Sequence, residues 1–177
     1  NSAYMSRIFF ILLFTIITLN QLQAQSPDTL EAYRLLTIAD SIYGKARTNY
    51  DQARTYYLEA RELYHEAGIY KQERKCLLRA GNASYRRQDY DTAKVTYEEL
   101  ASFTQQYFPD DFNTLSTAMS NIGAIYSIKG RYTEARVLAE KSLELRQNNL
   151  GETHKRTGES LYNLGTIYLE LGEFDLA

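Results

Sequence analysis

Apolar residues and tyrosines recur every three or four positions along most of the chain, the spacing that lines one face of an α-helix. In one stretch Met119, Ile122 and Tyr126 keep this spacing, and a second stripe begins at Tyr132, after Gly130. Because glycine commonly follows the last residue of a helix, the two stripes are predicted to be separate helices. Applied along the chain, the pattern predicts seven helices, at about residues 26–46, 50–67, 70–87, 90–107, 114–129, 132–148 and 155–171.

The helical pattern itself repeats with a period of 42 residues. Residues 121–126 (NIGAIY) return as residues 163–168 (NLGTIY), and one period earlier Gly81 falls on Gly123. A period of roughly 20–50 residues is typical of a solenoid, in which stacked units bury apolar faces that no unit buries alone. Tyrosines alternate with small residues such as Gly123, so large rings are expected to fill the space that small residues leave. A coiled coil of six heptads is the alternative, but the recurring glycines change the phase of the stripe.

The repeated motif resembles the tetratricopeptide repeat, whose signature is a large apolar residue, then L-G-x-x-Y, then A-x-x-x-F. It appears as Met119, residues 122–126 and Ala135, and again as Leu161 and residues 164–168. The longer period is similar to that of kinesin-light-chain-type repeats. The resemblance implies an all-α fold, a TPR-type solenoid of antiparallel helix pairs stacked into a right-handed superhelix.

The repeat array is expected to occupy residues 26–177, with about three and a half helix pairs. The chain stops at Ala177, close to where an eighth helix would begin. A natural solenoid ends in a polar capping helix. We therefore expect the sequence to be the N-terminal part of a longer protein of the bacterial exported type.

The first 25 residues have the pattern of a signal peptide. Arg7 follows the first methionine, Met5, and residues 8–19 form an apolar run that is too short for a membrane span of about 20 residues. Ala24 is a small residue suited to a cleavage site. Cleavage after Ala24 and export, to the periplasm or out of the cell, are expected. An uncleaved membrane anchor is the alternative.

Charge and motifs exclude several classes of function. Lysine and arginine total 20 and the acidic residues 22, a net charge of −2, whereas nucleic-acid binding needs a basic face. A single cysteine, Cys76, excludes an internal disulfide and a cysteine-based zinc site. The sequence has no phosphate-binding glycine loop, no H-E-x-x-H helix and no G-x-S-x-G element. No catalysis, cofactor, metal or small-molecule substrate is expected in this chain.

The resemblance implies a peptide-binding groove. In tetratricopeptide arrays the first helix of each unit lines a concave face that holds an extended peptide. The 42-residue register places ten polar residues on that face: Lys75, Arg79, Asn82, Arg86, Thr117, Asn121, Glu159, Asn163, Thr166 and Glu170. Asparagine suits this task because its amide both donates and accepts hydrogen bonds. Alternatively, these residues only make the face soluble.

Two features of this residue set bear on the ligand. Asn82 and Asn121 match two asparagines of the family's carboxylate clamp, but Leu78, Glu159 and Asn163 stand where the clamp has basic residues, so the clamp is not expected. The charges run from basic in the second unit to acidic in the fourth. A ligand that is acidic over the second unit and basic over the fourth would match them.

Two hypotheses of function follow. The first is an exported protein–protein interaction scaffold or adaptor that binds extended protein or peptide segments in the groove. It contacts a membrane only through the signal segment, if this is uncleaved. The second is the recognition or regulatory arm of a larger protein, because similar arrays often precede a caspase-like CHAT peptidase domain or a sensor histidine kinase.

Overall fold

The computed structural model describes residues 26–45 and 49–176, so the predicted signal segment, residues 1–25, lies outside the described residues. Within the described part, regular structure is helical throughout. The elements are α2 (Pro27–Lys45), α3 (Tyr50–Glu66), α4 (Tyr70–Arg86), α5 (Tyr90–Tyr107), α6 (Phe112–Ile128), α7 (Tyr132–Leu150), α8 (Lys155–Leu171) and the short 3₁₀ helix η1 (Phe174–Leu176).

Each predicted α-helix is present. The largest differences are at Phe112, two residues before the expected start of α6, and at Leu150, two residues beyond the expected end of α7. Helix α6 starts early because the Asp111 side chain accepts a hydrogen bond from the backbone N–H of Thr114 at 3.0 Å. A capping aspartate of this kind stabilises a helix N-terminus.

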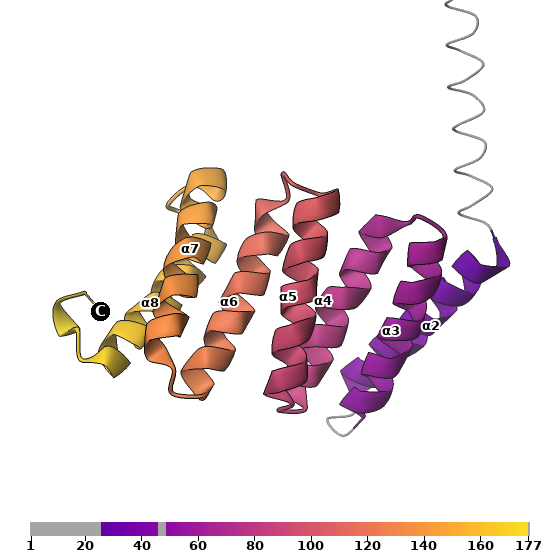
Figure 1. Ribbon diagram of the computed structural model, residues 1–177, viewed down its shortest axis with the longest axis horizontal. Coiled ribbons are helices and arrows are strands. Elements are labelled where there is room, and N and C mark those ends of the chain that lie inside the picture. The colour runs from indigo at the N-terminus through magenta and orange to yellow at the C-terminus, as the bar shows by residue number, and fades with distance from the viewer. Residues whose placement is uncertain (1–25, 46–48, 177) are drawn as a thin grey trace, which may run out of the picture.

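Consecutive helices pack against one another, and Figure 1 shows them standing side by side in a row from α2 to α8. Each pair consists of a first helix (α2, α4, α6 or α8) and, in the first three pairs, a second helix (α3, α5 or α7). Buried apolar side chains form three clusters, centred on α2–α4, on α4–α6 and on α7–α8. This is the stacking expected of an all-α solenoid, in which every interior helix is covered by its neighbours.

Tyrosine rings fill the first two pairs. The ring of Tyr97, on α5, is 1% exposed and lies over Gly81 of α4, where an added Cβ would stand 2.6 Å from a ring carbon. The Tyr97 hydroxyl donates a hydrogen bond to Asn82 Oδ1 at 2.8 Å, and the Tyr57 hydroxyl donates to Asp40 Oδ1 at the same distance. The expectation that rings fill the space over small residues is confirmed here.

The third pair differs from this expectation. The residue one period after Tyr97 is Ala139, so no ring covers Gly123. A Cβ on Gly123 would lie 3.5 Å from the carbonyl oxygen of Ala135, an ordinary contact distance. Helices α6 and α7 therefore approach closely at Gly123, but they leave room for a methyl group.

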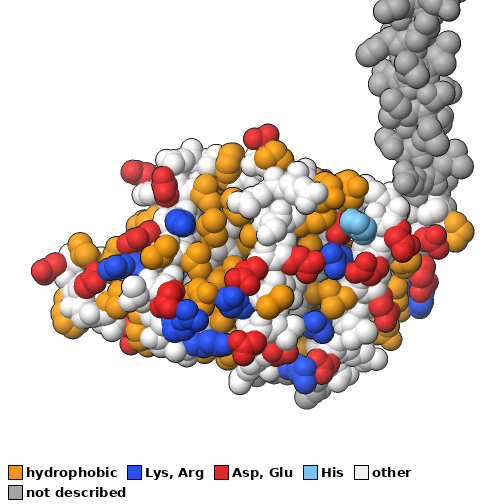
Figure 2. Space-filling view, viewed as in Figure 1, with side chains coloured by type: hydrophobic (Ala, Val, Ile, Leu, Met, Phe, Trp, Pro, Cys, Tyr) orange, Lys and Arg blue, Asp and Glu red, His pale blue; other side chains and the backbone are white. Residues whose placement is uncertain are grey.

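The surface seen in Figure 2 intersperses acidic and basic side chains without a broad area of one sign. This distribution agrees with the small net charge of the chain. Among the described residues, no helix combines the length and the apolar character needed to cross a membrane.

Candidate functional site

Two adjoining cavities are lined by residues of α6 and α8, the first helices of the third and fourth pairs. The polar hollow has a volume of about 600 Å³ and is lined by Thr117, Ser120, Asn121, Arg146, His154, Lys155, Arg156, Glu159 and Asn163. The apolar pocket has a volume of about 250 Å³ and is lined by Tyr85, Ser120, Gly123, Ala124, Ser127, Ile128, Ala139, Ser160, Tyr162, Asn163, Thr166 and Ile167. Ser120 and Asn163 belong to both cavities, so one ligand can reach both.

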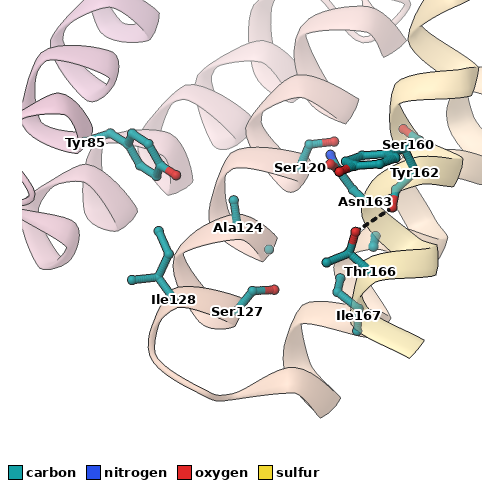
Figure 3. Close-up of a pocket in the computed structure, with 12 residues that line it drawn as sticks. Tyr85, Ser120, Ala124, Ser127, Ile128, Ser160, Tyr162, Asn163, Thr166 and Ile167 are labelled. Carbon is teal, nitrogen blue, oxygen red and sulfur yellow. Dashed lines mark hydrogen bonds between the residues drawn. The ribbon is translucent and has the colours of Figure 1, made fainter. Parts of the chain in front are cut away.

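Figure 3 shows how the apolar pocket is built. Ala124 and Ile128 of α6 face Thr166 of α8 across the pocket, and Tyr85 of α4 stands on the far side. Ile128 is 49% exposed and forms part of the rim. The pocket therefore combines apolar walls with a few hydroxyl and amide groups.

Four of the predicted groove residues meet in the polar hollow: Thr117, Asn121, Glu159 and Asn163. Among the described residues, the side-chain amides of Asn121 and Asn163 form no hydrogen bond within the chain. The amide oxygen of Asn82, by contrast, accepts the Tyr97 hydroxyl. The two asparagines of the hollow are thus available to a ligand, while Asn82 already holds α4 against α5.

Basic side chains gather where α7 and α8 border the hollow. Arg146 is 5% exposed, and its guanidinium donates to Ser116 Oγ (3.3 Å), the carbonyl of Arg156 (2.9 Å) and Ser160 Oγ (2.8 Å). All three acceptors are neutral, and within the described residues Arg146 forms no ion pair. Burial lowers the pKa of Arg146, because the charged form loses solvation. Lys155 adds a further positive charge to the lining.

The predicted acidic end of the groove also holds basic side chains. Glu159 is the acidic residue of the polar hollow, and its carboxylate lies 3.9 Å from Lys155 Nζ. With Arg146 and Arg156 also in the lining, the hollow carries a net positive charge. The predicted set did not include these residues, because Arg146 lies on the second helix α7 and Lys155 and Arg156 lie in the first turn of α8.

The second-unit residues of the predicted groove lie apart from the two cavities. Lys75 is exposed and lines a separate hollow with Arg74 and Thr114. Arg79 and Asn82 line another with Asp40, to which Arg79 is ion-paired. Here a chain carboxylate already neutralises the arginine.

The remaining predicted residues divide between the pocket and the surface. Thr166 lines the apolar pocket, although its hydroxyl also donates to the carbonyl of Tyr162 at 3.0 Å. Arg86 is exposed and borders neither cavity. Glu170 hydrogen-bonds Tyr132, which raises the pKa of that tyrosine, and it too lies outside both cavities.

Metal binding and thiol chemistry were considered for the described residues. No group of three or more histidine, cysteine, aspartate or glutamate side chains in this part of the chain is placed to hold a metal ion. Cys76 is fully buried, and burial raises the pKa of its thiol to about 12. A thiol of that pKa carries almost no thiolate at neutral pH and is a poor nucleophile.

Known proteins with similar sequences or structures provide a comparison for this helical array. Two models described as tetratricopeptide repeat match the sequence, one over residues 114–177 and the other over residues 75–102. These matches identify tetratricopeptide repeats in residues 75–102 and 114–177. The polar hollow and the apolar pocket both lie within the part that the longer match covers, apart from Tyr85 at the pocket's edge.

Solved structures share the helical architecture of this chain. BtubC (BKLC) from P. vanneervenii matches with a TM-score of 0.72 and 20% identity, over 86% of this chain and 61% of that protein. The apo form of RapI matches with a TM-score of 0.75 and 13% identity, over 88% of this chain and 42% of that protein. The chain thus spans less than two thirds of either neighbour's length, and at these identities the likeness concerns the fold.

Proposed function

We propose that this protein is an exported interaction scaffold that holds an extended protein or peptide segment against the first helices of its repeat array, without catalysis in this chain. Tetratricopeptide repeats generally mediate protein–protein binding, which supports the role of an interaction scaffold. The observation that carries the proposal is the pair of unengaged amides, Asn121 and Asn163, on facing helices of one hollow. Such amides can pair with the N–H and C=O groups of a peptide backbone whatever its side chains.

Binding is tested by panning the full chain against a library of random 12-residue peptides displayed on phage. The best peptides are then titrated against the double variant Asn121→Ala/Asn163→Ala. Each backbone hydrogen bond is worth about 0.5–1.5 kcal/mol net, so the variant should bind about 10–100-fold more weakly. Its melting temperature should hardly change, because neither amide has a partner in the chain.

The matched control removes two amides from a second helix. Gln105 and Gln106 are exposed on α5, so Gln105→Ala/Gln106→Ala should keep both affinity and stability. Equal affinity in the two double variants would exclude the polar hollow as the binding site. A large fall in melting temperature for Asn121→Ala/Asn163→Ala would assign the asparagines a structural role.

Export rests on the sequence of residues 5–24 alone. Expression in a bacterium with a Sec pathway should place the chain outside the cytoplasm, and intact-mass analysis should find a mature chain that starts at Gln25. A product that keeps Met5 in a membrane fraction would favour the anchor instead.

A further inference from the structure

The guanidinium of Arg146 is buried at the border of the polar hollow with one of its amino groups unused. Its Nε donates to Ser116 Oγ, and its Nη1 donates to the carbonyl of Arg156 and to Ser160 Oγ. Within the described residues the other amino group, Nη2, forms no hydrogen bond, and it is not sealed from solvent. Two N–H donors of a positively charged group are therefore left for a ligand in the hollow.

The lack of an acidic partner sets Arg146 apart from other arginines of the array. Three partly buried arginines of the first two helix pairs each face a carboxylate: Arg61 and Glu99, Arg74 and Asp111, Arg79 and Asp40. Arg146 is only 5% exposed, yet no carboxylate of the described residues lies within ion-pairing distance of it. Because a buried charge is costly unless it is paired, a negative charge from a ligand would be favourable here.

The rest of the lining is rich in hydrogen-bond donors. Of the nine side chains that line the polar hollow, eight contain an N–H or O–H group, and Glu159 is the exception. His154 Nδ1 accepts the backbone N–H of Arg156 at 3.1 Å, so the neutral ring carries its proton on Nε2, as a donor. Lys155 and Arg156 lie in the first turn of α8, where the helix dipole also favours an anion. The hollow thus suits a negatively charged ligand whose atoms only accept hydrogen bonds.

We propose that the polar hollow binds a phosphate-class dianion, either inorganic phosphate or a small phosphate monoester. The oxygens of such a group accept hydrogen bonds, and a monoester carries a charge of about −1.5 to −2 at pH 7. This charge complements three basic side chains set against one carboxylate. Peptide groups can meet the amides of Asn121 and Asn163, but they bring no charge to Arg146. The inference does not depend on the proposed function, since no peptide takes part in it.

Calorimetric titration of the full chain in a chloride buffer of constant ionic strength tests this inference. Inorganic phosphate and glycerol 2-phosphate are titrated separately, and the tighter of the two distinguishes a free from an esterified ligand. The wild type should bind one equivalent. Acetate, a monoanion, should bind about 10-fold more weakly, because it brings less charge to the basic side chains.

Variants of exposed positions give effects of opposite sign. Glu159→Gln removes the acidic side chain of the lining and should tighten phosphate binding about 5-fold. Lys155→Gln/Arg156→Gln should weaken it by about 10-fold or more. Arg86→Gln/Lys141→Gln removes the same charge from exposed positions outside the hollow and is the matched control, so its phosphate affinity should stay close to that of the wild type.

Melting curves in chloride should be alike for these variants and the wild type, because each changes an exposed side chain. Equal phosphate affinity in the two double variants, or weaker binding to Glu159→Gln than to the wild type, would overturn the inference. So would equal affinity for acetate and phosphate, or a wild-type dissociation constant above about 10 mM. None of these outcomes touches the proposed function, provided that peptides are titrated in a phosphate-free buffer.

Discussion

The second helix pair (α4, α5) and the third (α6, α7) are consecutive units of the repeat, and their interiors are packed differently. In the second pair Tyr97 covers Gly81, and the interior is closed. In the third pair Ala139 places no ring over Gly123, and the apolar pocket opens beside it. A few side chains thus decide whether a helix pair is filled by a tyrosine ring or left with a pocket.

Because of this difference, we expect the stability of the chain and its affinity for a ligand to depend on different residues. Substitutions in the filled pair should change the free energy of unfolding, because they disturb packed rings and their hydrogen bonds. Substitutions of Asn121 and Asn163 should change affinity instead, since their amides form no hydrogen bond within the described residues. The four predictions below test that separation, from the largest expected effect to the smallest.

High pH should unfold the filled part of the array first. Burial raises the pKa of Tyr57 and Tyr64 on α3 from 10.0 to about 12 and also raises that of Tyr97 on α5. The folded state keeps these phenols neutral while the unfolded state ionises near pH 10. Their stabilising contribution is therefore complete below pH 10 and disappears as the pH rises toward 12, by about 2–3 kcal/mol each for Tyr57 and Tyr64.

Circular dichroism between pH 8 and about 12.5 measures this loss. Tyr64→Phe should move the alkaline midpoint to higher pH, because one raised phenol no longer titrates. Tyr162→Phe, at a position 77% exposed, should leave the midpoint unchanged. Identical midpoints for the wild type and Tyr64→Phe would show that the buried tyrosines do not control alkaline unfolding.

Removing the ring of the filled pair should be the most damaging single substitution. Tyr97→Ala deletes a buried ring and its hydrogen bond, which should lower the free energy of unfolding by about 3–5 kcal/mol in urea titrations. Tyr162→Ala, at an exposed position, should stay within about 0.5 kcal/mol of the wild type. A loss below about 1 kcal/mol for Tyr97→Ala would contradict the description of this pair as filled.

The same substitution at two matching glycines should have opposite effects. Gly81→Ala places a methyl group against the Tyr97 ring and should destabilise by about 1–3 kcal/mol. Gly123→Ala meets only ordinary contacts and should stabilise by up to about 1 kcal/mol, the difference in helix propensity. Equal changes in the urea midpoint would mean that the two pairs are packed alike.

The smallest effect concerns the turn between the helices of each pair. Gln88 has φ +66°, in the left-handed region, where the third and fourth units have Gly130 and Gly172. That conformation is strained for a residue with a side chain, so Gln88→Gly should stabilise the second pair by about 0.5–1 kcal/mol. Gly130→Ala is the reverse control and should lower the melting temperature. Destabilisation by Gln88→Gly would show that the side chain matters more than the backbone conformation.

Local pattern was sufficient to predict the helices. The expected start of α5 at Tyr90 and of α7 at Tyr132 agrees with the structure, because apolar spacing and turn residues act on near neighbours in the chain. The resemblance and the 42-residue register together placed Asn121 and Asn163 on one face, and both side chains line the polar hollow. A periodic sequence carries this information because each unit repeats the same environment.

Only the tertiary structure distinguished residues that the register treats as equivalent. Arg79 is ion-paired with Asp40, whereas Asn121, one period later, has no side-chain hydrogen bond within the described residues, and the pattern of the first helices does not contain that difference. Arg146 became part of the site because α7 brings a second-helix side chain to the border of the hollow. The apolar pocket lies where two small residues, Ala139 of α7 and Gly123 of α6, come together. Contacts of this kind depend on how two helices pack, and the spacing of residues within one helix does not specify them.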